Sequence, residues 1–443
     1  MAYPKLTDRQ GAIETAAAIR RGELTAVQAV EHAIARIERL DAHINAVVVT
    51  DFERALEAAR ALGPAPANQQ PLFGVPMTVK ESFDVAGLPT TWGHARYRDQ
   101  IARRDSVVVA RLKAAGAIIL GKTNVPPDLA DLQSDNPLHG RTNNPHDHTR
   151  VAGGSSGGGA AAVASGMVPC EYGSDIGSSI RNPAHFNGIW GHKTSFGLVS
   201  RRGQTHPVME GQDIYDGPLS VVGPLARNAD DLALLLDVTA DRPLQRRPKP
   251  LAAMRMLALL DHPRSEVDNA VRAPIEAALA QIEKTGTTID RDSDLVPDLA
   301  RQHADYMTLL NVTLARGQPS GSGKALALAD WFALRDAQAQ NEYAWAALFE
   351  RYDFVLAPPL AFLAYPHDRT PMRERRIAIN GKDSAFADTL AWAGLASFPN
   401  LPSTVLPVGD TGSLPCGMQV IGPRWGDFDC ISAAKAMGEI LHG

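Results

Sequence analysis

Cysteine, long apolar runs and clustered basic residues are scarce in this chain of 443 residues. The three cysteines, Cys170, Cys416 and Cys430, are an odd number without CxxC spacing, so we expect reduced, buried thiols in a cytoplasmic protein rather than a disulfide framework. Apolar runs such as residues 232–236 are far too short to cross a bilayer. The opening MAYPKLTDRQ has no apolar core of a signal peptide. We therefore expect no membrane partner.

An excess of one charge is also missing. Lys and Arg number 44 against 49 Asp and Glu, which gives a formal net charge of −5 with both signs interspersed. Without a basic stripe that could follow a phosphate backbone, nucleic acid is not an expected partner. No His, Cys and carboxylate residues show metal-ligand spacing along the chain, and His146 and His148 fit a polar loop better than a metal site. We expect neither a metal ion nor a cofactor.

The chain does contain alternating helix and strand patterns, with 44% hydrophobic residues to build a sizeable core. Thr25 is expected to cap a helix with one apolar face. Further helices are predicted at 105–115, 157–165, 230–238, 266–283, 325–351 and 428–441. Strands are predicted at 45–50, 76–80, 117–120, 353–357, 404–408 and 418–421. This alternation predicts an α/β fold, a large mixed, twisted β-sheet flanked by helices on both faces. Residues 64–71 and 241–250 are expected to be loops or linkers.

Two glycine-rich turns carry serines: GGSSGGG at 153–159 and GSDIGSSIR at 173–181. Glycines let the backbone turn tightly near a ligand, and serine hydroxyls serve acyl transfer or proton relay. Lys80 closes the apolar segment 75–79, where burial lowers the pKa of an ammonium group. These are the parts of a Ser–Ser–Lys hydrolase. The alternative for Lys80 is a simple ion pair with Glu81 or Asp84.

Other motifs compete with this interpretation. Residues 116–123 match the phosphate-loop pattern GxxxxGK[ST], but a helix is predicted before the first glycine and Pro126-Pro127 bar a helix after the lysine. Residues 153–157 match a GxSxG nucleophile elbow, although a loop-like segment precedes them. His185 and His192 flank the second serine turn as alternative bases, but the sequence offers no convincing His–Asp pair.

The segments GVPMTVKE, ARLKAAGAIILGKTN, GGSSGGGAAAVASG, GSDIGSSIR and VGPLAR together resemble the amidase signature family of serine hydrolases. The resemblance implies a single α/β/α domain over residues 1–443, with a signature core at about 71–227 and a variable region at about 241–350. It implies an amidohydrolase that cleaves a carboxamide or related C–N acyl bond, with carbamate (urethane) or ester substrates left open. The alternative is the glutaminase-type A subunit of a tRNA-dependent amidotransferase. A non-catalytic scaffold is a third hypothesis. We expect a small amide or carbamate as binding partner and leave a homodimer open.

The family's roles map onto numbered residues here. Ser179 matches the nucleophile that becomes acylated, Ser155 matches the relay serine preceded by a cis peptide bond, and Lys80 matches the base. The resemblance also implies an oxyanion hole and an acyl channel. The oxyanion hole would be formed by the N–H groups of Ile176, Gly177, Ser178 and Ser179. The acyl channel would be lined by Asp128, Leu129, Leu132 and Gln133, with the loop 209–216, including Asp213, as another wall.

The sequence departs from the family pattern at two places. Ser178 stands where the family has glycine, so a positive φ there would strain the loop, and its side chain is expected to narrow or polarise the pocket. Lys193-Thr194-Ser195 replaces the usual Lys-Pro-Thr. Neither change removes a group assigned to catalysis.

Overall fold

The computed structural model describes residues 10–442 except 64–69, 210, 213, 216, 319–324, 411 and 413. Eleven strands form one mixed sheet, with parallel pairing of β2 to β3 and β6 and antiparallel pairing around β8 and β14. Across the sheet the order is β1 (Val47–Thr50), β3 (Ile118–Thr123), β2 (Pro76–Lys80), β6 (Cys170–Asp175), β8 (Val221–Ala226), β7 (Trp190–Lys193), β14 (Ser403–Asp410), β15 (Pro415–Ile421), β11 (Phe354–Ala357), β9 (Arg255–Ala258) and β10 (Thr288–Asp290). The predicted α/β fold with a large mixed sheet is confirmed.

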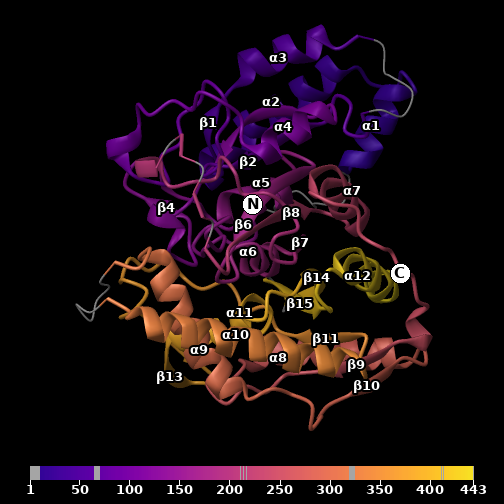
Figure 1. The fold of residues 1–443 in the computed structure, drawn as a ribbon. Coiled ribbons are helices and arrows are strands. Elements are labelled where there is room, and N and C mark those ends of the chain that lie inside the picture. The colour runs from indigo at the N-terminus through magenta and orange to yellow at the C-terminus, as the bar shows by residue number, and fades with distance from the viewer. Residues whose placement is uncertain are drawn as a thin grey trace.

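Helices and two short hairpins surround this sheet (Figure 1). The helices are α1 (Ala12–Arg20), α2 (Ala26–Ile44), α3 (Phe52–Ala61), α4 (Val107–Ala114), α5 (Gly157–Ala164), α6 (Arg181–Asn187), α7 (Ala229–Thr239), α8 (Asn269–Glu283), α9 (Leu299–Leu314), α10 (Leu328–Phe349), α11 (Ala391–Ser397) and α12 (Asp427–His442). The hairpins are β4 (Asp135–Asn136) with β5 (Gly140–Arg141), and β12 (Arg376–Ile379) with β13 (Lys382–Ala385). Figure 1 shows the N-terminal elements above and the C-terminal elements below, meeting where β7 pairs with β14.

Each face of the sheet has its own core because side chains alternate along a strand. In β3, Ile118 and Leu120 pack in a cluster with α2, α3 and α5. Ile119 between them joins the larger cluster that includes α4, α7, α8 and α12. Both faces of the central strands are thus buried, which explains why β2, β3 and β6 read as continuous buried segments rather than alternating ones.

Local sequence explains two of the helices in the N-terminal part of the chain. The Thr25 hydroxyl accepts a hydrogen bond from the Gln28 N–H, which caps α2 as predicted. Helix α5 consists of glycine, alanine and valine because it lies against the backbone that follows β3. A Cβ on Gly158 would stand 2.3 Å from the Asn124 nitrogen. This close approach holds the first serine turn against the sheet.

The parallel arrangement of β2 and β6 positions the site. Val79 pairs with Tyr172, so Lys80 at the end of β2 and the turn after β6 lie at the same edge of the sheet. The carboxyl ends of parallel strands are where α/β proteins place their ligands. The second serine turn follows Asp175, the last residue of β6, and therefore comes to the same edge as Lys80.

Most predicted elements are present with ends shifted by a few residues. Elements that were not predicted include the strands β6 to β10 and the helices α1, α6, α11 and α9, of which α9 bears on the site. Its buried face includes Gln302 and His303 beside Tyr306 and Leu309, and these polar residues obscure the apolar periodicity. The phosphate-loop match is excluded because its lysine, Lys122, lies inside β3 with its ammonium bonded to the Pro89 carbonyl and the Thr90 hydroxyl.

Other expectations have mixed outcomes. The three cysteines are free and buried, as predicted. Most of the predicted loop 64–71 lies outside the described residues, whereas 241–250 is irregular and largely exposed. Within the described part of the chain, no helix combines the length and apolar character needed to cross a bilayer.

Candidate active site

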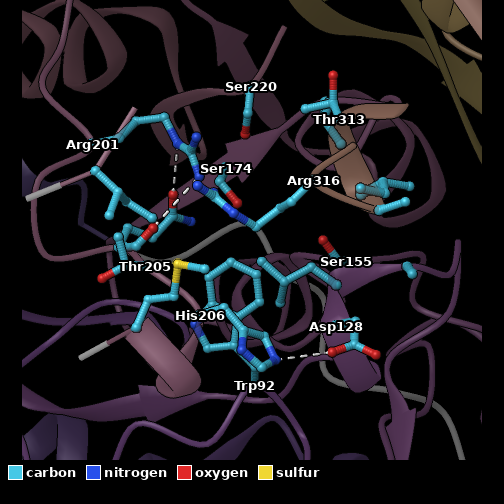
Figure 2. Close-up of a pocket in the computed structure, with 18 of the residues that line it drawn as sticks. Trp92, Asp128, Ser155, Ser174, Arg201, Thr205, His206, Ser220, Thr313 and Arg316 are labelled. Atoms are coloured by element: carbon cyan, nitrogen blue, oxygen red, sulfur yellow. Dashed lines mark hydrogen bonds and ion pairs between the residues drawn. The ribbon is translucent and has the colours of Figure 1, made fainter. Parts of the chain in front are cut away.

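A cavity of about 680 Å³ opens at the carboxyl edge of β2 and β6. Basic, acidic and apolar side chains line it. Figure 2 shows Arg201 and Arg316 on one side of the cavity and Trp92, Asp128 and His206 on the other. The apolar part of the lining is formed by Trp92, Leu129, Ala130, Ile176, Val208, Met209, Ile214, Tyr215, Leu314 and Ala315. Ser155, Ser174 and Ser179 are also in the lining, so both serine turns reach this space.

Lys80 is fully buried and bonded to three hydroxyl groups, two of which belong to serines that line the cavity. Its Nζ is 2.7 Å from Ser155 Oγ, 3.0 Å from Ser156 Oγ and 3.0 Å from Ser174 Oγ. The alternative pairing with Glu81 is wrong, because the Glu81 carboxylate accepts the N–H groups of Thr91 and Trp92. The structure thus joins Lys80 directly to the first serine turn.

Burial changes the charge of this lysine. Removal of water from the ammonium group lowers the pKa of Lys80 from 10.5 to about 7, although nearby Asp175 and Glu171 oppose the shift. Near pH 7 a large fraction of Lys80 is then neutral, and a neutral amine can accept a proton from a bonded hydroxyl. Of the three contacts that Lys80 Nζ makes, the one to Ser155 Oγ is the shortest, at 2.7 Å.

The two serine turns contact each other. The peptide bond between Gly154 and Ser155 is cis, and the Ser156 N–H donates to the Ser179 carbonyl at 3.2 Å. Asn182 connects both turns: its side-chain amide donates to the carbonyls of Gly154 and Ser178 and accepts from the Gly154 N–H. These bonds fix Ser155 relative to Ser179.

An ion pair holds the second serine turn in shape. The Arg181 guanidinium donates to both oxygens of Asp175, at 3.1 and 2.9 Å, and both side chains are fully buried. The same carboxylate accepts the backbone N–H groups of Ser178 and Ile180. Asp175 and Arg181 therefore hold the shape of the turn that carries Ser179.

The backbone donors of this turn differ from the expectation at Ser178. Its N–H is bonded to Asp175 Oδ1 at 3.0 Å, so this group does not point freely toward the cavity and the assignment of Ser178 to the oxyanion hole needs correction. Among the described residues, the N–H groups of Ile176, Gly177 and Ser179 have no hydrogen-bond partner. Those three remain as candidate donors to a developing oxyanion.

Ser178 has the positive φ that its family position suggested, 76°, a region that disfavours residues with a Cβ. Its hydroxyl bonds to the Pro359 carbonyl at 3.2 Å, and the side chain is fully buried. The expectation that Ser178 narrows or polarises the pocket is wrong, because the side chain turns into the protein interior.

Tyr306 on α9 contacts the same turn, and this role of Tyr306 was not predicted from the sequence. Its hydroxyl donates to the Ile176 carbonyl at 2.9 Å, and its ring is fully buried. A helix from the middle of the chain therefore holds a residue beside the nucleophile candidate. A sequence pattern that predicted α9 and placed Tyr306 on its buried face would have indicated this contact.

We expect Tyr306→Phe to lower kcat/KM by roughly tenfold, because an unpaired buried carbonyl costs about 1–3 kcal/mol and loosens the turn. Steady-state hydrolysis and a thermal melt should be measured together. Tyr343→Phe is the matched control, since Tyr343 on α10 is 76% exposed, and should leave both unchanged. Equal activity of the two variants would show that the contact does not position the turn.

The predicted acyl-channel residues separate in space. Leu129 lines the cavity. Leu132 and Gln133 do not: Leu132 packs in the hydrophobic core, and the Gln133 amide bonds to Asp131 and the Asp368 carbonyl. These two predictions are corrected, because Leu129 has a positive φ of 58° that turns the chain away after it. Asp128 also lines the cavity, whereas Asp213 lies outside the described residues.

The histidines proposed as alternative bases lie elsewhere. Contrary to expectation there is a buried His–Asp pair, His192 Nε2 to Asp427 Oδ1 at 3.1 Å, but neither residue lines the cavity. His185 is also buried outside it, bonded to the Gly417 N–H and the Phe362 carbonyl, and burial lowers the pKa of His185 to about 4. His146 bonds to the Asn187 carbonyl, and the His148 ring stacks on His43.

A cluster of two histidines and one aspartate borders the cavity. It was not predicted from the sequence. His94 Nε2 and His206 Nε2 lie 2.7 and 3.1 Å from the same oxygen of Asp128. The three residues are 34 and 78 positions apart, so no spacing along the chain could indicate them. Their short segments are brought together only by the turns that wall the cavity.

A mixed sheet with helices on both faces, and a buried lysine bonded to the first of two serine turns, are the features of the amidase signature hydrolases. Comparison with known proteins agrees. The sequence model described as Amidase matches residues 28–310. The chain belongs to this family.

Individual relatives share most of the chain. An indoleacetamide hydrolase from Bradyrhizobium diazoefficiens is 33% identical, over 96% of this chain and 85% of its own. The 1-carboxybiuret hydrolase subunit AtzE from a Pseudomonas species is 30% identical, over 96% of this chain and 97% of its own. A bacterial aryl acylamidase of the amidase signature family superposes with a TM-score of 0.81 at 25% identity, over 97% of this chain and 96% of that one.

Proposed function

We propose that this protein hydrolyses the carboxamide, or a related C–N acyl bond, of a small molecule through an acyl-enzyme on Ser179. The observation that carries the proposal is the 2.7 Å contact between buried Lys80 and Ser155, in a cavity that Ser179 also lines. Membership of a hydrolase family that acts on C–N bonds supports the reaction type.

In the proposed acylation, neutral Lys80 accepts the Ser155 proton while Ser155 accepts the proton of Ser179. The Ser179 oxygen then forms a bond to the substrate carbonyl carbon. Negative charge on the carbonyl oxygen is stabilised by N–H groups of the turn, with Ile176, Gly177 and Ser179 as candidates. The amine leaves with a proton returned through Ser155, and water hydrolyses the ester by the same route in reverse.

The lining favours an acyl group with an apolar or aromatic part. Leu129, the adjacent Val208 and Met209, Trp92 and Tyr215 all line the cavity. Apolar side chains around a few polar groups are typical of sites for small organic ligands. Two relatives are described as acting on indoleacetamide and carboxybiuret, which supports a small amide and leaves its identity to experiment.

A panel of chromogenic anilides, primary amides, carbamates and esters with matched acyl groups tests the proposal. We expect aryl or apolar amides to give the highest kcat/KM, with release of the amine and the acid in equal amounts. The amidotransferase-subunit alternative predicts glutamine hydrolysis that depends on partner proteins. Turnover of glutamine with no turnover of the panel would overturn the proposal in favour of that alternative.

We expect prolonged dialysis against a chelator to leave amide hydrolysis unchanged. Side chains of this chain supply the base, the relay and the nucleophile, so the proposed proton transfers require no bound ion. The measurement is kcat/KM before and after dialysis, with buffer-dialysed protein as control. Loss of activity that added zinc restores would contradict the proposed mechanism.

A further inference from the structure

Three metal-ligating side chains converge at the wall of the cavity. His94 precedes a short helical turn (Ala95–Tyr97), Asp128 lies in another (Pro127–Leu129), and His206 precedes a third (Pro207–Met209). Their nearest side-chain N and O atoms all lie within 4.8 Å of one another. Both imidazoles direct Nε2 at the same Asp128 oxygen, so two nitrogens gather around one carboxylate oxygen.

The surroundings orient this cluster without closing it. The Trp92 ring stands edge-on to His206 at 5.4 Å, and Tyr97 stands edge-on to His206 and His94 at 5.6 and 6.0 Å. The two imidazoles are each 23% exposed and the Asp128 side chain 55% exposed. An ion could therefore reach the three groups from solvent or from the cavity.

The donor set selects the kind of ligand. Two imidazole nitrogens and one carboxylate oxygen suit Zn²⁺ and related divalent transition metals, and three protein ligands leave a fourth position open. Ligands about 2.0–2.1 Å from zinc stand roughly 3.3–3.4 Å apart in a tetrahedron. The two N–O separations here are 2.7 and 3.1 Å, so the side chains move slightly apart when an ion enters. We propose that His94, Asp128 and His206 bind a divalent cation of the zinc class at the cavity wall.

Binding also changes the tautomer of His206. The Val208 N–H donates to His206 Nδ1 at 3.3 Å, which leaves the proton of the neutral ring on Nε2. A cation on Nε2 moves that proton to Nδ1, so the long Val208 contact is lost as the metal bond forms.

The proposal is independent of acyl transfer, because Lys80 bonds to Ser155, Ser156 and Ser174 rather than to this cluster. Chelator-treated full-length protein should be titrated with Zn²⁺ by calorimetry and with Co²⁺ by visible absorption. We expect one cation per chain and an intense Co²⁺ band of a four- or five-coordinate site. Asp128→Asn, and the double variant His94→Ala/His206→Ala, should each weaken binding at least roughly tenfold.

Two controls separate this site from others. His43→Ala/His148→Ala removes another imidazole pair, whose rings stack 6.2 Å apart, and should leave the affinity unchanged. Ser179→Ala should also bind normally, so failure of the proposed hydrolysis and failure of the cation site give different results. Absence of Co²⁺ absorption in the wild type, or equal Zn²⁺ affinity in the cluster variants, would overturn the proposal in favour of a hydrogen-bonded clamp.

Discussion

Replacement of Ser179 by alanine is expected to lower the hydrolysis rate by roughly 10⁴–10⁶-fold, the loss seen when a serine hydrolase loses its nucleophile. Ser179 lines the cavity in a turn fixed by Asp175 and Arg181. Removal of its hydroxyl leaves the turn and its backbone donors in place, so substrate binding should persist while acylation stops. Single-turnover kinetics and substrate binding on the same variant measure the two effects separately.

Covalent labelling gives a direct test of which serine is acylated. A fluorophosphonate should modify one peptide, the one that contains Ser179. Ser178→Gly is the matched control, because the Ser178 hydroxyl bonds to Pro359 and its φ of 76° suits glycine. This variant should be labelled like the wild type and Ser179→Ala should not. Modification mapped to Ser155 or Ser156 would refute the assignment and revive the nucleophile-elbow interpretation.

Lys80→Arg is expected to lower the acylation rate by roughly 10²–10⁴-fold, the contribution of a lost general base. A guanidinium stays charged at any accessible pH, so it cannot accept the Ser155 proton. Lys80→Ala should lose at least as much, because it also removes the contacts to Ser155, Ser156 and Ser174. Burst amplitude and rate on an activated ester measure acylation apart from deacylation.

The pH dependence follows from the same burial. Because the pKa of Lys80 lies at about 7, the charged form dominates below that pH and the neutral base above it. The acylation rate should therefore rise with pH through about 7 and level off at higher pH.

Ser155→Ala should cut the rate yet leave residual turnover from the oxyanion donors. Near-normal turnover by Lys80→Arg would show that a neutral lysine is not required.

Local sequence was sufficient where one segment determines its own conformation. Thr25 and the apolar spacing after it predicted α2 and its cap, and the apolar run that ends at Lys80 predicted β2. Glycines at the serine turns predicted a tightly turned backbone near a ligand. The position of Lys80 at the end of an apolar segment predicted that burial lowers its pKa. Each of these inferences depends on neighbours a few positions away, which periodicity and composition reveal.

Inferences failed where a distant segment decides the outcome. Helix α9 buries Gln302, whose amide bonds to helices α10 and α11, and His303, whose ring contacts His262 in a loop. Its amphipathic pattern is therefore weak in the sequence. Leu132 and Gln133 were expected in the cavity from the family resemblance. The backbone turn at Asp128 and Leu129, both with positive φ, sends them inward instead.

The sequence alone determined the α/β class, the two serine turns and the lysine that closes an apolar strand, because each is written in contiguous residues. Only the tertiary structure decided which groups meet. Parallel pairing of β2 with β6 brings Lys80 to the serine turns, Asp175 takes the Ser178 N–H, and α9 delivers Tyr306 to Ile176. His94, Asp128 and His206 likewise meet only after folding. Contacts between residues tens to hundreds of positions apart depend on how the chain packs, and short-range sequence patterns do not indicate that packing.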